Sequence, residues 1–277
     1  MMSLEKGSGL PIEMRDDYSL VFSGGLPQVK PAVREFSAMK NFLKDPGSQF
    51  ARREVYYMYR DLAKSEHVEA IHAAGLEYDI TIIPPGLIGD EYVKTIGHYH
   101  PYKPGTTIRY PEVYEVIYGK VFFLLQSASE DLERLIDVYV VAAERGDKVL
   151  VPPGFGHVSV NPGDDVLVMS NWQPLGNKGL YEPYEARNGA AYYITASKRL
   201  QKTGKTTPDF DFAANMNYQQ VPPLRHVRAR DLPQYELRSA LPMYFTATRD
   251  LSTLDFLVNP EKYTDDLIPE KLFVPQN

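Results

Sequence analysis

The stretch GDKVLVPPGFGHVSVN (residues 146–161) has the pattern of two short strands joined by a tight turn. Residues 148–151 and 157–161 contain the β-branched residues that favour strands, and residues 152–154, Pro-Pro-Gly, have the composition of a turn. A second stretch, GHYHP (residues 97–101), places two histidines one residue apart. Together the two stretches predict strands that carry imidazoles.

Those imidazoles, with one carboxylate, form a candidate site for a divalent metal. Side chains two residues apart in a strand point the same way, so His98 and His100 can reach one ion. Glu112 and His157 follow on later predicted strands. A His-x-His pair alone is also compatible with two surface histidines on one face of a strand. The spacing of the residues around the pair favours the metal site.

The composition sets limits on the class of protein. A chain of 277 residues with 43% hydrophobic residues can bury a sizeable core in one large domain, or in a domain with an extension. The net charge of −6 comes without a basic stripe, so we expect no nucleic-acid partner. No apolar run suits a membrane span, and residues 1–15 do not resemble a signal peptide. The absence of cysteine excludes thiolate ligands and favours a cytoplasmic location.

Short strands at regular spacing, with Gly and Pro between them, predict an antiparallel sandwich or barrel. The predicted strands are 54–60, 78–83, 92–100, 113–118, 120–126, 137–142, 148–151, 157–161, 166–172 and 190–196.

Other segments have different patterns. Residues 31–44 have a helical apolar spacing, and residues 65–74 have a helix signature with Ser65 as the N-cap. Residues 1–15 are expected to be flexible. Residues 201–217 have the polar composition of a linker within a proline-marked C-terminal extension, residues 201–277, which we expect to pack on the barrel or on a partner subunit.

Two motifs resemble those of the cupin superfamily. Residues 146–161 fit the pattern G-x5-P-x-G-x2-H-x3-N, and Glu112 precedes Gly119 by the usual six intervening residues. The chain departs from the first cupin motif in two ways. Eleven residues instead of three or four separate His100 from Glu112, and position 92 is Tyr92 instead of Gly. We interpret residues 101–111 as an enlarged loop.

The resemblance narrows to the cupin-type phosphoglucose isomerases, best known from archaea. Residues 91–100, EYVKTIGHYH, and residues 110–115, YPEVYE, are similar to that family, as is the turn over residues 84–89. The resemblance implies an all-β cupin double-stranded β-helix, or jelly-roll, barrel over residues 16–200, with a few short helices. It further implies a glucose-6-phosphate isomerase of glycolysis and gluconeogenesis, cytoplasmic and homodimeric, with a sugar phosphate as substrate.

Matched residue by residue, the resemblance assigns the site. The metal ligands would be His98, His100, Glu112 and His157, around one divalent Fe, Mn, Ni or Zn ion per subunit. Glu112 and His157 would be catalytic, and the substrate-binding residues would be Thr81, Thr95, Gly97, Tyr114 and Trp172. Glu115 is the rival carboxylate, but three residues along a strand it faces the other side.

Isomerisation of an aldose to a ketose moves a hydrogen between C2 and C1 and builds negative charge on an enediolate, which a divalent cation can stabilise. Glu112 is expected to carry the proton as well as to bind the ion, and a direct hydride shift is the alternative. Two other functions stay open. One is another metal-dependent cupin enzyme, such as a dioxygenase or a sugar epimerase, and the other is a non-catalytic sugar-phosphate binding protein.

Overall fold

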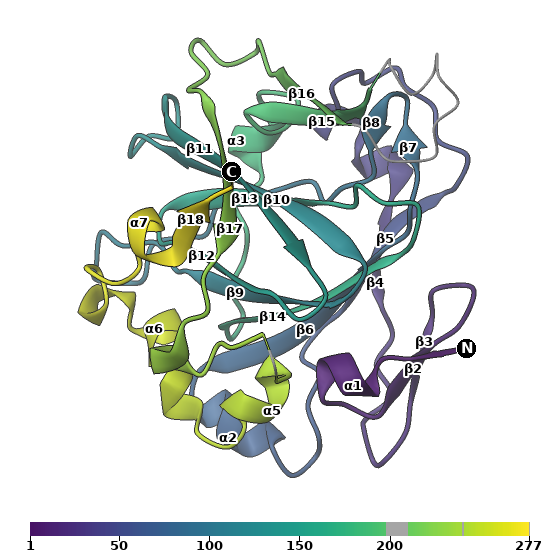
Figure 1. The fold of residues 1–277 in the computed structure, drawn as a ribbon, viewed down its shortest axis with the longest axis vertical. Helices are drawn as coiled ribbons and strands as arrows, with labels where there is room; N and C mark the ends of the chain where they lie inside the picture. Colours follow the sequence, from purple (N-terminus) through teal and green to yellow (C-terminus); the bar gives the residue numbers. More distant parts are fainter. Residues whose placement is uncertain (198–209, 240, 277) are drawn as a thin grey trace.

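Two large sheets enclose the main core in the computed structural model, which describes residues 1–197, 210–239 and 241–276 (Figure 1). The first sheet has the order β12 (Lys148–Val151), β9 (Glu112–Tyr118), β14 (Leu167–Pro174), β6 (Leu76–Ile83), β5 (Glu54–Tyr59) and β4 (Ala32–Glu35). The second has the order β13 (Phe155–Val160), β10 (Lys120–Ala128), β11 (Leu135–Glu144), β17 (Leu224–Ala229) and β18 (Phe273–Pro275). Tyr114 on β9 packs on Phe123 on β10 with ring centroids 5.0 Å apart, so the two sheets share one core. The predicted all-β barrel is confirmed.

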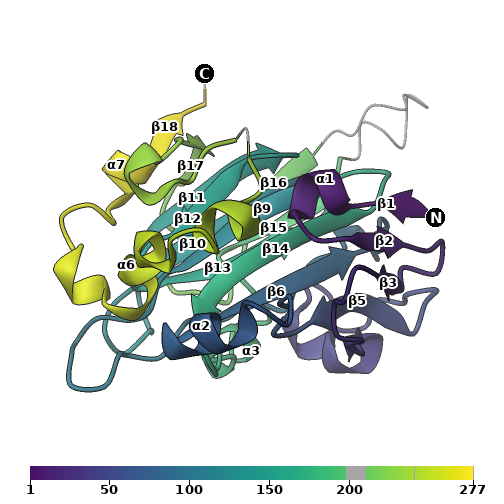
Figure 2. The same ribbon diagram turned by 90° about the horizontal axis from the view of Figure 1, so that it is seen from below.

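Smaller elements complete the fold (Figure 2). A four-stranded sheet contains β16 (Phe210–Ala214), β15 (Tyr192–Ala196), β8 (Glu91–Tyr92) and β7 (Leu87–Ile88), and a three-stranded sheet contains β1 (Met2–Ser3), β2 (Ile12–Met14) and β3 (Leu20–Phe22). The short α-helices are α1 (Glu5–Ser8), α2 (Val68–Ala73), α3 (Glu182–Glu185), α5 (Met243–Ala247), α6 (Asp255–Val258) and α7 (Pro269–Leu272). The 3-10 helices are η1 (Phe36–Ala38), η2 (Lys40–Phe42), η3 (Pro233–Tyr235), η4 (Leu251–Leu254) and η5 (Pro260–Lys262). Within the described ranges, no helix has the length and apolar character that crossing a membrane requires.

The pairing of strands overrides local propensity in residues 31–44, where the prediction of a helix was wrong. Ala32–Glu35 forms β4 and pairs with β5, and the register shifts between Arg34 and Glu35 in a β-bulge. Hydrogen bonds to β5 replace the intrahelical ones, and the chain then continues in two 3-10 turns. The structure therefore places Arg34 on an edge strand beside β5.

Three smaller expectations also need correction. The predicted helix over residues 65–74 is shorter, because α2 begins at Val68 with His67 as its N-cap. The predicted strand over residues 92–100 is largely a chain of isolated bridges, since β8 ends at Tyr92. Residues 1–15 were expected to be flexible, but they contain β1, α1 and β2, which are held in place by burial of side chains such as Leu10 and Ile12.

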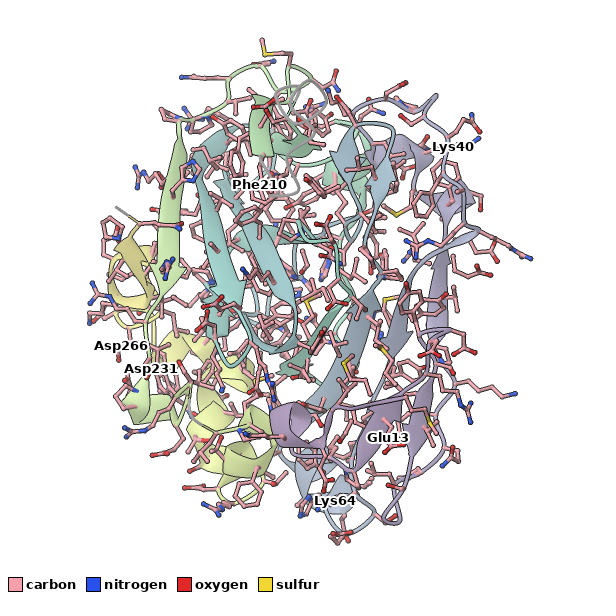
Figure 3. All side chains as sticks on the ribbon, turned by 45° about the vertical axis from the view of Figure 1, so that its right-hand side comes forward. Glu13, Lys40, Lys64, Phe210, Asp231 and Asp266 are labelled. Carbon is pink, nitrogen blue, oxygen red and sulfur yellow. The ribbon has the colours of Figure 1, made fainter. Side chains whose placement is uncertain are left out.

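The described part of the C-terminal extension packs on the barrel. β17 pairs in parallel with β11, and β18 pairs with β17, so the extension adds two strands to the second sheet. Figure 3 shows its residues Asp231 and Asp266 at the edge of the molecule opposite Lys40. Most of the predicted linker, over residues 201–209, lies outside the described residues, and β16 begins at Phe210.

Candidate metal centre

Four side chains predicted as metal ligands meet between the two large sheets. One ligand atom from each of His98, His100, Glu112 and His157 lies within 4.8 Å of all the others. The Nε2 atoms of His98 and His100 are 3.2 Å apart. Glu112 Oε2 lies 3.1 Å from His100 Nε2 and 3.2 Å from His157 Nε2. Except for His98, which is partly exposed, the four residues are buried.

Backbone pairing brings these residues together from distant parts of the sequence. His98 and His157 form an antiparallel bridge in which each amide donates to the other's carbonyl, at 3.2 and 3.0 Å. His157 lies on β13 of one sheet, and Glu112 is the first residue of β9 in the other. His100 follows His98 at the spacing that keeps both imidazoles on one side.

The four ligand atoms lie close enough together to share one ion, and two of them, His98 Nε2 and His100 Nε2, are within hydrogen-bond distance of each other. Among the described residues, Glu112 Oε2 has no hydrogen-bond partner, although two imidazole nitrogens lie close to it. Burial lowers the pKa of His98 well below its usual value and also lowers the pKa of His157. Burial alone would raise the pKa of Glu112, but His100 and His157 hold it well below its usual range. Neutral imidazoles and an ionised carboxylate are the forms that bind metal, so the cluster could hold a metal ion.

Neighbouring groups orient the ligand atoms toward this centre. His100 Nδ1 lies 2.9 Å from the carbonyl oxygen of Tyr110, which assigns the proton to Nδ1 and leaves the Nε2 lone pair for a metal. Asn171 Nδ2 donates to Glu112 Oε1 at 2.6 Å and leaves Oε2 facing the cluster. Outer partners of this kind are typical of metal sites that bind through His and carboxylate.

A polar pocket opens beside the cluster. It contains four of the predicted substrate residues, Thr81, Thr95, Gly97 and Tyr114. Its other polar side chains, which sequence reasoning had missed, are Arg34, Tyr56, Arg60, Asn171, Gln173, Asn177 and Tyr181. Its free volume is about 60 Å³, whereas pockets that enclose ligands usually measure about 300–1,000 Å³. The free space in this pocket is therefore smaller than that of a typical ligand pocket.

Some of the residues missed by sequence reasoning could have been found from local strand alternation, whereas Arg34 could not. Tyr56, Met58 and Arg60 alternate along the strand that was predicted over residues 54–60, so that pattern does place them on one face. Arg34 could not be found in this way, because its segment had been assigned to a helix. A larger groove of about 360 Å³ lies over β10 and β11 and contains none of the metal ligands.

Trp172, the fifth predicted substrate residue, does not line the pocket, and this expectation must be corrected. Side chains alternate along β14, so Asn171 and Gln173 face the pocket and Trp172 faces away. Its side chain is fully buried, stacked on Tyr244 at a centroid distance of 5.9 Å and packed on Tyr78 at 4.9 Å. Trp172 therefore belongs to the core beneath α5.

Glu115, the rival carboxylate, also lies away from the cluster. Its Oε1 pairs with Lys148 Nζ at 2.9 Å, and its Oε2 accepts a hydrogen bond from the Met243 amide at 2.7 Å. Burial, only partly offset by the charge of Lys148, raises the pKa of Glu115 to about 7. The choice of Glu112 over Glu115 as the candidate ligand thus agrees with the geometry.

Comparisons with known proteins identify the family of this chain. Residues 30–210 match the family model described as glucose-6-phosphate isomerase. A glucose-6-phosphate isomerase from Pyrococcus abyssi is 29% identical over 57% of this chain and 76% of that one. The enzyme of that name from Thermococcus litoralis is 32% identical over 53% of this chain and 70% of that one.

Among solved structures, an oxalate decarboxylase from Bacillus subtilis matches at 19% identity with a TM-score of 0.32, over 46% of this chain and 28% of that one. A similarity of that extent carries no conclusion about this chain. The family match is different, because it covers more than half of the sequence and includes all four candidate ligands. The chain belongs to the glucose-6-phosphate isomerase family.

Proposed function

We propose that this protein is a metal-dependent aldose–ketose isomerase that interconverts glucose 6-phosphate and fructose 6-phosphate. The observation that carries the proposal is the His98, His100, Glu112 and His157 cluster beside a polar pocket, in a member of this family. These residues would hold one divalent ion, and Fe²⁺, Mn²⁺, Ni²⁺ and Zn²⁺ all accept imidazole and carboxylate ligands. When bound, the ion would polarise sugar oxygens and stabilise the charge of an enediolate.

A cationic side chain in the pocket supports a phosphorylated substrate. Arg34 lines the pocket and donates from Nε to the Tyr56 hydroxyl at 3.2 Å, and among the described residues it has no carboxylate partner. The other arginine of the pocket, Arg60, is 2.5 Å from the buried carboxylate of Asp79. Arg34 therefore has its charge available for a phosphate, which guanidinium groups bind through paired hydrogen bonds.

The predicted substrate residues Thr81, Thr95 and Gly97 are compatible with binding the phosphate end of the substrate. Thr95 Oγ1 accepts a hydrogen bond from the Ser159 amide at 3.0 Å, so its own hydroxyl proton can be donated to a phosphate oxygen. Thr81 lines the same pocket and is buried. Gly97 has a φ of +79°, and a Cβ there would lie 2.4 Å from Val158 Cγ2, so only glycine fits.

Glu112 and His157 remain the candidate catalytic residues. Asn171 fixes one carboxylate oxygen of Glu112, and the Tyr114 hydroxyl lies 2.9 Å from His157 Nε2. Burial raises the pKa of Tyr114 well above its usual value, so its hydroxyl stays protonated and can donate to a sugar oxygen. Glu112 as a proton carrier and a direct hydride shift are the two routes by which the hydrogen can move between C1 and C2.

Isotope transfer from solvent separates these two routes. Fructose 6-phosphate is converted in D₂O, and the product is examined by NMR for deuterium at C2. Deuterium in the product supports proton transfer by Glu112, because a base exchanges its proton with solvent. Complete absence of deuterium supports the hydride shift and argues against Glu112 as the base.

A chelator assay tests the function itself. Purified protein is given fructose 6-phosphate, and formation of glucose 6-phosphate is followed with and without EDTA. Glu112→Gln is expected to abolish turnover. Glu115→Gln, on the same strand but facing the opposite way, is the matched control and should keep it. Oxygen consumption would instead indicate a dioxygenase, and binding without turnover would indicate a binding protein.

The proposal also includes the oligomeric state and the cellular location of the enzyme. We propose a homodimer, because a second copy could cover the exposed edges of the sheets. We also propose a cytoplasmic location, which the lack of cysteine favours. Analytical ultracentrifugation tests the dimer, and metal analysis of protein purified without an affinity tag identifies the ion.

A further inference from the structure

The enlarged loop over residues 101–111 folds as a small hairpin whose end contacts a candidate metal ligand. Tyr102 bridges Arg109, and the Lys103 amide donates to the Ile108 carbonyl at 2.9 Å. At the base of the hairpin, the Tyr110 carbonyl accepts from His100 Nδ1 at 2.9 Å. Arg109 also donates to the His100 carbonyl at 2.8 Å. The loop therefore fixes both the backbone and the ring of His100.

The first strand of this hairpin is held by the C-terminal extension. Lys103 Nζ donates to Asn259 Oδ1 and to Glu261 Oε1, both at 2.7 Å. Asn259 is itself fixed, because its amide donates to Asp255 Oδ1 at 2.6 Å. A groove of about 300 Å³ beside this contact is lined from both segments, by residues that include Ile108, Arg109, Leu267 and Ile268.

The hairpin departs from the general cupin motif, and the extension lies outside the part of the chain matched by the family model. The spacer of eleven residues before Glu112 is longer than the three or four usual in cupins. The extension that contains residues 255–268 lies beyond residues 30–210, the range matched by the family model. The extension supplies contacts that the hairpin needs, because a short hairpin without a core of its own is only marginally stable.

We propose that residues 255–268 are a positioning element for the metal centre and act on His100 through Lys103 and the hairpin. This inference rests on the metal site proposed above. With Lys103 tied to the extension, the Tyr110 carbonyl stays in place and holds the His100 ring with Nε2 toward the cluster. Without that tie, the hairpin samples other conformations and the ring loses its partner. Loss of such an outer partner typically costs about 10–100-fold in metal affinity.

A charge exchange tests the proposal in the full chain. Protein stripped of metal is titrated with Co²⁺, which gives an affinity and an absorption spectrum that reports ligand geometry. Lys103→Glu places two carboxylates together and is expected to weaken Co²⁺ binding about tenfold and to alter the spectrum. Adding Glu261→Lys restores opposite charges and should recover both. Lys271→Glu, which disrupts the exposed pair with Asp266 on the same extension, is the matched control and should change neither.

The outcomes are distinct. Wild-type affinity and spectrum in a folded Lys103→Glu variant would overturn the positioning role and leave the metal site standing. A loss that the exchange fails to rescue would also overturn it. If wild-type protein bound no Co²⁺, or if His157→Ala bound it equally well, the proposed metal site itself would fail. Should Lys103→Glu not fold, Glu261→Ala removes one partner at the half-exposed surface, and the same comparison applies.

Discussion

Replacing Arg34 by Gln should weaken the binding of fructose 6-phosphate without slowing the chemical step. Arg34 on the edge strand β4 pairs with Tyr56 on β5 and donates to its hydroxyl, and both residues line the pocket. Hydrogen bonds from a charged donor contribute about 1.5–3 kcal/mol. Since about 1.4 kcal/mol corresponds to a tenfold change, the KM should rise about 10–100-fold.

The two kinetic constants distinguish this role from a structural one. A phosphate contact is made equally in the ground and transition states, so kcat should stay within about twofold. Arg34→Lys keeps the charge but not the paired donors, and should have an intermediate KM. Arg53→Gln is the control, because Arg53 is exposed and paired with Glu35. The reasoning would be refuted if Arg34→Gln left KM unchanged, or if it lowered kcat alone.

Three further predictions follow from the same geometry. Gly179→Ala should weaken metal binding about tenfold in a calorimetric titration, because its Cβ would lie 2.6 Å from His98 Cδ2, and unchanged affinity would contradict this. Glu115 has a pKa of about 7 when folded and 4.5 when unfolded, so its contribution to stability is present below pH 4.5 and falls as pH rises to 7. Urea denaturation should show that the free energy of unfolding of the wild type falls by on the order of 3 kcal/mol more than that of Glu115→Gln between pH 4.5 and pH 8. The same pH dependence in both proteins would count against this prediction. Trp172→Phe should lower the free energy of unfolding by about 1–3 kcal/mol with the KM for fructose 6-phosphate unchanged, and a raised KM would restore Trp172 as a substrate contact.

The metal ligands could be predicted because they depend on local patterns. The alternation of side chains along a strand fixes His98 and His100 on one side, and the same alternation separates Glu112 from Glu115. The turn before His157 is equally local. Local alternation does not show that these residues meet, and their grouping into one site came from the resemblance to the two cupin motifs.

The features that were missed depend on contacts between distant segments. Arg34 enters the pocket only because β4 pairs with β5, whereas the apolar spacing of residues 31–44 by itself suits a helix. Trp172 was assigned to the substrate by resemblance. It follows Asn171 directly on β14, so its side chain points to the opposite face of the sheet. The extension showed no periodicity, and its strand β17 forms by parallel pairing with β11, far away in the sequence.

Reconstitution of the metal-free protein tests the central claim most directly. Protein stripped by chelator is titrated with Mn²⁺ while the conversion of fructose 6-phosphate is measured at each addition. The account predicts no activity before addition, a linear rise to one equivalent per chain, and no response in His157→Ala. Full activity in the stripped protein, or equal recovery in His157→Ala, would contradict it.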